Sequence, residues 1–123
     1  MKLRCVTNSI RLRVRKSDLE KLTDTGKVAE SIGFPGGTSL EFMLSMSTSA
    51  VPDCTYQAHQ VLVSIPTTVV QNWVNSNEVG LNYTFDLADG EQLNVLIEKD
   101  FPCNHSDADF EDTFFELVEG EQC

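Results

Sequence analysis

One group of side chains whose types could do chemistry lies near the carboxyl end of the chain. Cys103 and His105 stand two residues apart, and Asp107 follows at the same interval. Thiolate, imidazole and carboxylate are ligand types that suit zinc and similar divalent ions. The Cys-x-His spacing is not that of a standard structural zinc site, and a fourth ligand would have to come from elsewhere. A polar loop without metal is the interpretation that we favour.

Catalytic constellations are not evident in the sequence. The two histidines are His59, which falls in an expected turn, and His105, whose neighbour Cys103 is too close along a loop to fix a nucleophile–base geometry. The glycines of residues 33–37 belong to a hairpin turn and not to the strand-to-helix junction that binds phosphate. We therefore expect a protein that is not an enzyme and has no cofactor, with a divalent metal as the open alternative.

A second group of candidate residues is basic. Arg11, Arg13 and Arg15 alternate with apolar residues in IRLRVR, so on a strand they share the face opposite the apolar side chains. They form a candidate patch for a polyanion or a partner, because guanidinium groups contact phosphates well. Three cations so spaced also repel one another. We expect acids of residues 28–123 to offset each arginine, which would leave no free polyanion site.

The net charge of −10 is unevenly distributed along the chain. Residues 1–27 hold eight of the nine basic groups and three acids, whereas residues 28–123 hold sixteen acids and Lys99. Such asymmetry can mark a nucleic-acid site with an acidic tail. In one small domain, however, both charges lie within reach of each other, so we expect internal neutralisation.

The cysteines and the apolar runs indicate where in the cell the protein is located. The four cysteines form no CxxC pair, and no export signal or membrane-spanning run is recognisable. These features predict free thiols, a cytoplasmic location and no contact with membranes. Cys5 and Cys54 fall in apolar alternation and are predicted to lie in the core.

Period-two alternation of apolar residues predicts four strands in the first half of the chain. They cover residues 2–7, 10–15, 27–34 and 38–46. Asn8-Ser9 suits a tight turn between the first two strands. Ser17 and Glu20 form a capping box for a helix that ends at Gly26.

The second half repeats this pattern at an offset of 51 residues. Its predicted strands cover residues 54–58, 61–65, 79–86 and 91–98. Thr68 and Gln71 form the second capping box, and Trp73 lies on the apolar face of the helix, where we expect it to be buried. Val28 then corresponds to Val79, and two extra residues fall in the second hairpin turn.

This repeat predicts one domain over residues 1–123. It contains a unit at 2–46, a second at 54–98 and an acidic segment at 100–123. A unit of about 50 residues is marginal alone, whereas two units that exchange hairpins can share one core and remove sheet edges. The predicted fold is mostly β with two short helices (α+β), in which duplicated ββαββ units form a swapped-hairpin-like barrel.

The second unit resembles the swapped-hairpin barrels of AbrB-type regulators and MazE-type antitoxins. The resemblance is carried by Ile65-Pro66 at the end of a strand, the short helix around Trp73, and the Asp89-Gly90 turn. The first unit has Arg15-Lys16 in place of Ile-Pro. Two chains usually form the barrel in that family, so this chain looks like both halves fused.

The resemblance implies DNA binding through basic residues of the barrel. The second unit, however, has Leu62, Ser64 and Pro66 where the first has its three arginines, so we expect nucleic acid not to be the partner. The start MKLR, the run NSIRLR and the ending EKDFPC also resemble a group of small bacterial proteins of unknown activity.

The acidic tail leaves two alternatives open. Between Asp107 and Glu121, seven acids alternate with apolar residues at helical spacing. The segment either packs on the barrel as a helix or docks on another protein. We expect a non-catalytic binding module whose partner is another protein, as monomer or dimer. A DNA-binding regulator or antitoxin-like protein and a metal-binding protein are the alternatives.

Overall fold

The computed structural model describes residues 1–100 and 114, and most of these residues lie in strands. Eight strands and two helices follow one another along the chain. They are β1 (Lys2–Val6), β2 (Ser9–Val14), α1 (Lys16–Thr25), β3 (Lys27–Phe34), β4 (Thr38–Ser47), β5 (Asp53–Gln57), β6 (Gln60–Pro66), α2 (Thr67–Val74), β7 (Gly80–Asp86) and β8 (Gln92–Lys99). The mostly β composition with two short helices is as expected. No described helix is long and apolar enough to cross a membrane.

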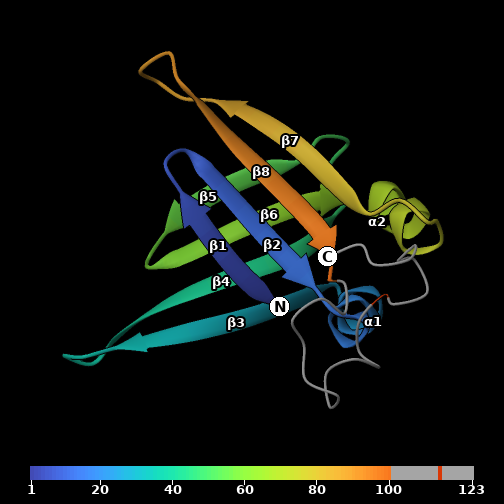
Figure 1. Ribbon diagram of the computed structural model, residues 1–123, viewed down its shortest axis with the longest axis horizontal. Coiled ribbons are helices and arrows are strands. Elements are labelled where there is room, and N and C mark those ends of the chain that lie inside the picture. The colour runs from blue at the N-terminus through green and yellow to red at the C-terminus, as the bar shows by residue number, and fades with distance from the viewer. Residues whose placement is uncertain (101–113, 115–123) are drawn as a thin grey trace, which may run out of the picture. The chain divides into compact units, whose positions relative to one another are not determined.

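The strands form two four-stranded sheets (Figure 1). The first sheet has the order β1-β2-β8-β7 and the second the order β3-β4-β6-β5. In each sheet two antiparallel hairpins are joined by a central parallel pair, β2 with β8 and β4 with β6. The described strands therefore do not close into one barrel, because closure requires every edge strand to have a second neighbour.

The chain divides into two compact units. One unit contains Met1–Leu19 and Asn77–Cys123, and with them the first sheet. The other contains Glu20–Ser76, and with them the second sheet and α2. The two hairpins of the first sheet thus come from opposite ends of the described chain, whereas those of the second sheet follow one another in the sequence.

The first sheet has one apolar face and one polar face, as alternation requires. Its apolar face buries Leu12 and Val14 of β2 and Val95 and Ile97 of β8. The parallel register places Leu12 directly opposite Ile97. The preceding turn is Thr7-Asn8, one residue before the expected position, because Ser9 already pairs with Val6.

The second sheet is built in the same way and carries α2. Phe42 and Leu44 of β4 and Val63 of β6 are buried, and α2 lies against these two strands. Trp73 of α2 is only 1% exposed, which confirms its predicted burial. Apolar side chains at helical spacing therefore hold α2 on the sheet.

Both helices begin earlier than their predicted caps. α1 starts at Lys16, so Arg15 is its N-cap, and Asp18 accepts a 2.8 Å hydrogen bond from the Arg15 amide. The expected Ser17–Glu20 capping box is therefore wrong. α2 starts at Thr67 without a side-chain cap, so the Thr68–Gln71 box is wrong as well. Each helix follows its strand almost directly, and the end of the strand decides where the helix begins.

The two extra residues of the second half do not lie in its hairpin turn. Leu87 donates to the Glu91 carbonyl over 2.8 Å, so this turn has three residues, as between Phe34 and Thr38. The added length lies between α2 and β7. Val28, which pairs with Leu44, and Leu81, which pairs with Ile97, are both buried, whereas Val79 is 40% exposed, so the predicted match of Val28 with Val79 is wrong.

Cys5 and Cys54 are free thiols, as expected. Cys5 is exposed, so its predicted core position is wrong, and Cys54 is half-buried. Cys5 points to the apolar side of β1, but β1 is an edge strand and that side is poorly covered there.

Candidate functional site

Four basic side chains gather on the polar face of the first sheet. The antiparallel register places Lys2 opposite Arg13 and Arg4 opposite Arg11. All four alternate with the apolar residues of their strands, so they share one face. We call Lys2, Arg4, Arg11 and Arg13 the basic face. Directly opposite residues in such a pair have Cβ atoms about 5 Å apart, so like charges there repel.

Glu98 of β8 offsets two of these cations. It lies opposite Arg13 in the parallel pair, and its Oε1 is 2.9 Å from Arg13 Nε and 3.5 Å from Arg11 Nε. The expectation that acids of residues 28–123 lie near the arginines is confirmed for these two residues. One carboxylate shared between two guanidinium groups leaves part of the positive charge without a counterpart among the described residues.

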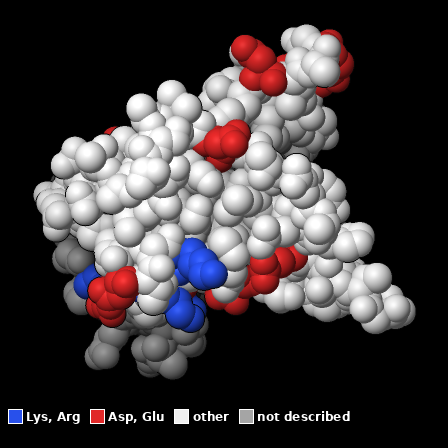
Figure 2. Space-filling model, turned by 180° about the vertical axis from the view of Figure 1, so that it is seen from behind, with Lys and Arg blue, Asp and Glu red and all other residues white. Residues whose placement is uncertain are grey.

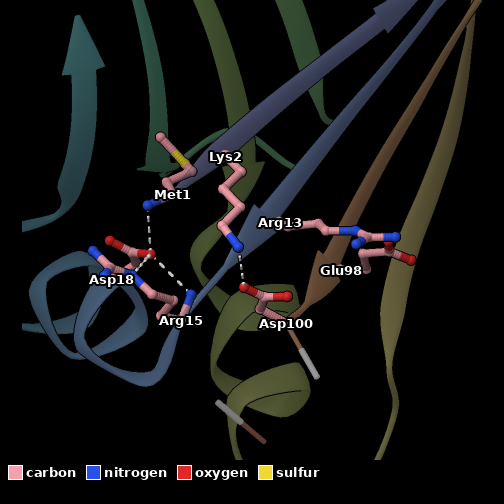
Figure 3. A network of polar contacts seen from close by, with 7 residues as sticks. All are labelled: Met1, Lys2, Arg13, Arg15, Asp18, Glu98 and Asp100. Carbon is pink, nitrogen blue, oxygen red and sulfur yellow. Dashed lines mark hydrogen bonds and ion pairs between the residues drawn. The ribbon is translucent and has the colours of Figure 1, made fainter. Parts of the chain in front are cut away.

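Arg15 belongs to a different group. It follows the last residue of β2, and its Nε lies 3.6 Å from Asp18 Oδ2. The same carboxylate oxygen lies 2.8 Å from the Met1 ammonium (Figure 3). Among the described residues, Arg15 thus pairs with an acid of the first 27 residues. A partner from residues 28–123 stays a prediction for this arginine. The end of β2 at Val14 separates Arg15 from the two arginines of the strand.

Lys2 meets a second buried carboxylate. Its Nζ lies 3.3 Å from Asp100 Oδ2, and Asp100 is 1% exposed. The Asp100 amide donates to the Val14 carbonyl over 2.8 Å, which fixes the chain just beyond β8. Figure 3 shows the Lys2 side chain directed at Asp100, so this end of the basic face is also offset.

Arg4, the cation at the other end of the basic face, is not offset in this way. No carboxylate of the described residues forms an ion pair with Arg4. Its side chain borders a hollow of about 160 Å³ whose other lining residues are Val6, Ser9 and Arg11. Val6 is 59% exposed. Sequence reasoning missed Arg4 and Lys2, although both alternate with apolar residues in KLRCV and a tight turn brings that strand beside IRLRV.

The matching positions of the second sheet carry no such charge. Ser45 and Ser64 stand opposite each other there, with their hydroxyl oxygens 3.2 Å apart, where the first sheet has Glu98 and Arg13. Leu62 takes the place of Arg11. The basic face is thus confined to one sheet. On the side seen in Figure 2 the few basic side chains lie close to acidic ones.

Two groups with perturbed protonation lie outside the basic face. Burial raises the pKa of the Cys54 thiol, and the negative charge of Asp53 raises it further. Burial, and then the charge of Glu78, likewise raises the pKa of Tyr83. Both groups are therefore held in their neutral forms, and a protonated thiol is a weak nucleophile and metal ligand.

The predicted metal ligands Cys103, His105 and Asp107 lie outside the described residues. Within residues 1–100 and 114, no group of three or more histidine, cysteine, aspartate or glutamate side chains is placed to hold a metal ion. The one feature that stands out chemically in this part of the chain is the basic face with its incompletely offset charge.

The two sheets and the basic face define the class of this molecule: a small two-sheet β protein with a basic patch on one sheet. The chain belongs to a family of unknown function (DUF7009), whose model matches residues 1–116. No curated protein and no solved structure matches the chain.

Proposed function

We propose that this protein is a non-catalytic module that binds an acidic surface of another protein through its basic face. The observation that carries the proposal is the imbalance on that face. Four cations meet two carboxylates, those of Glu98 and Asp100, and Arg4 forms no ion pair with the described residues. In a chain of net charge −10, such a local excess of positive charge selects for a negatively charged partner.

The surroundings of Arg4 support a protein partner. Protein interfaces combine apolar contact with polar groups, and arginine is enriched in them. The exposed Val6 and the half-buried Leu96 supply apolar surface beside Arg4 and Arg11. The hollow between Arg4 and Arg11 offers a place for one carboxylate of the partner.

Nucleic acid is the less favoured partner. Tight binding to a duplex requires many phosphate contacts, and three of the four cations already have carboxylate partners. The second sheet has Asp53 and Thr55 where the first has Lys2 and Arg4. The surplus of acids elsewhere in the chain would also repel a phosphate backbone.

We also propose that the fold is a duplicated swapped-hairpin arrangement, related to that of the AbrB-type and MazE-type families. Strand registers support it. Ile10 pairs with Val95 in the first sheet, and Val61 pairs with Phe42 in the second. Ile10 precedes Val61 by 51 residues and Phe42 precedes Val95 by 53. These are the offsets between equivalent residues of the two halves, before and after the two extra residues. Each sheet then takes one hairpin from each copy.

The proposed function is tested with random peptides displayed on phage. We expect selection to enrich sequences rich in aspartate and glutamate. We expect Arg4→Thr to bind the selected peptides at least about tenfold more weakly, since a charged hydrogen-bonded contact contributes about 1.5–3 kcal/mol. Lys21→Thr, which removes an exposed lysine of α1, is the matched control and should bind as the wild type does.

Retention on heparin and on duplex DNA at about 0.1 M salt separates the two partner classes. We expect little or no retention. Strong retention that falls steeply with salt and disappears in Arg4→Thr would favour the DNA-binding alternative. Selected peptides without acidic residues would contradict the proposed role of the basic face.

A further inference from the structure

The edge of the first sheet formed by β1 is open among the described strands. β1 pairs with β2 on one side only, and all of its residues except Leu3 are exposed. No proline interrupts β1, and its five residues pair in an unbroken register from Lys2 to Val6. An uninterrupted edge strand presents backbone N–H and C=O groups that can accept another strand.

The direction of these backbone groups follows from the neighbouring strands. The Val14 carbonyl accepts a hydrogen bond from Asp100, on the β8 side of β2. Successive residues of a strand direct their N–H and C=O groups to opposite sides. Arg11 and Arg13 therefore direct theirs towards β1, where they form hydrogen bonds with the backbone groups of Arg4 and Lys2, respectively. Leu3 and Cys5 therefore direct their N–H and C=O groups outward, away from β2.

The side chains of β1 decide which kind of strand fits this edge. Lys2 and Arg4 repel the β1 strand of a second copy, because like charges directly opposite each other are destabilising. Arg4, which forms no ion pair with the described residues, attracts a strand that carries acids. Lys2 adds to this attraction because its side chain stays 56% exposed beside Asp100. Val6, on the same face, offers apolar contact to the next side chain of that strand.

We infer that the acidic partner binds as an extended segment that adds a fifth strand to the first sheet, next to β1. This inference rests on the proposed function and specifies its binding mode. Backbone hydrogen bonds to Leu3 and Cys5 supply sequence-independent affinity, and acidic side chains beside Lys2 and Arg4 supply selectivity. The segment is recognised by alternating acidic residues in an extended backbone.

The second sheet supplies the contrast. β5 is its edge strand and pairs with β6 in the same register, with Asp53 and Thr55 at the positions of Lys2 and Arg4. Tyr56 is at the position of Cys5. An acidic strand meets a carboxylate there instead of a lysine. Binding therefore distinguishes β1 from β5 by charge, although both edges have the same backbone geometry.

The probe is a fluorescently labelled peptide of eight residues in which glutamate and threonine alternate. We expect it to bind the full chain and to slow amide hydrogen exchange at Leu3 and Cys5, measured by NMR. Cys5→Pro removes an outward N–H and should weaken binding about tenfold or more. Tyr56→Pro is the matched variant on β5 and should leave affinity unchanged.

The outcomes separate the inference from the proposed function. Binding that weakens in Arg4→Thr without protection of the Leu3 and Cys5 amides, or that is unchanged in Cys5→Pro, would overturn strand addition but keep the basic face. Affinity that is insensitive to Arg4→Thr would overturn both. If Cys5→Pro does not fold, amide protection in the wild type decides alone. Absence of peptide binding, or protection that grows with protein concentration without peptide, also overturns the inference.

Discussion

At the residue scale, the buried carboxylate of Asp18 contacts several cationic and hydrogen-bond-donating groups. Its Oδ2 lies 2.8 Å from the Met1 ammonium and accepts the hydrogen bond of the Arg15 amide, also at 2.8 Å. A buried carboxylate is stable only where cations and donors surround it. Asp18 therefore ties the start of β1 to the start of α1.

Replacing Asp18 by alanine should destabilise the protein strongly. We expect the free energy of unfolding to fall by about 3–5 kcal/mol, because the buried ammonium and the Arg15 amide lose a charged acceptor. Urea unfolding followed by circular dichroism measures the change. Asp24→Ala, at an exposed position of the same helix, should stay within about 0.5 kcal/mol of the wild type. Equal losses in both variants would contradict the role of Asp18.

Cys54 should react slowly with alkylating reagents, because burial and the charge of Asp53 raise its pKa. The variant to use has the other three cysteines replaced by serine. Its alkylation rate should rise with pH, and the midpoint pH of that rise should be higher in the folded chain than in the same chain unfolded in urea. Asp53→Asn should lower this midpoint part of the way, since burial remains. The raised pKa also means that the contribution of this thiol to stability is present below its unfolded pKa and is lost as pH rises through the folded pKa. A midpoint equal to that of the unfolded chain would exclude the shift.

At the element scale, α2 depends on the burial of its apolar side against β4 and β6. Trp73 and Val70 are each 1% exposed and come from one face of the helix. No side chain caps α2 and it has eight residues, so its own hydrogen bonds cannot hold it. Packing of these two side chains therefore stabilises the element.

Trp73→Ala should cost about 3–5 kcal/mol of unfolding free energy, because it leaves a large cavity under α2. As the single tryptophan, Trp73 should also give the wild type a blue-shifted emission maximum that moves to longer wavelength on unfolding. Asn72→Ala, at the exposed neighbouring position, is the control. A solvent-like emission maximum in the folded protein would refute the burial.

At the scale of the whole molecule, each sheet combines one hairpin from the first half of the chain with one from the second half. The parallel pair β2–β8 joins residues 9–14 to residues 94–99, and the parallel pair β4–β6 joins residues 41–47 to residues 60–66. Neither half of the chain contains a complete sheet. The two halves should therefore fold only together.

Fragments that end and begin in the exposed loop between β4 and β5 test this dependence. We expect residues 1–49 and residues 50–123 to be unfolded separately, because an isolated hairpin is at best marginally stable. Mixed in equal amounts, they should recover the β-type circular dichroism of the intact chain. A stable β structure in either fragment alone would contradict the shared sheets. The folded intact chain, cleaved once in this loop and kept in native buffer, is the positive control and should retain its β-type circular dichroism.

Much of the local structure was predictable because it depends on local patterns. The alternation in IRLRV and VLVSI places strands, Gly26 ends α1 with a φ of 86°, and Trp73 faces the core. The capping boxes failed because the preceding strands, and not the polar side chains, set the start of each helix. The two extra residues were predicted in the turn at Asp89-Gly90, whereas the strand pairing gives that turn three residues and leaves the added length between α2 and β7.

The sequence by itself determined the eight strands, the two helices and the alternation that puts arginines on one side of β2. The turns also indicated the hairpins, but only the tertiary structure decided that β2 pairs with β8, which places Glu98 beside Arg11 and Arg13. Lys2, Arg4 and Glu98 join Arg11 and Arg13 because β1 and β8 flank β2, and Arg15 leaves the group because the strand ends at Val14. Alternation is a property of a few neighbouring residues. The pairing of β2 with β8 joins residues more than eighty positions apart, and no local pattern specifies those partners.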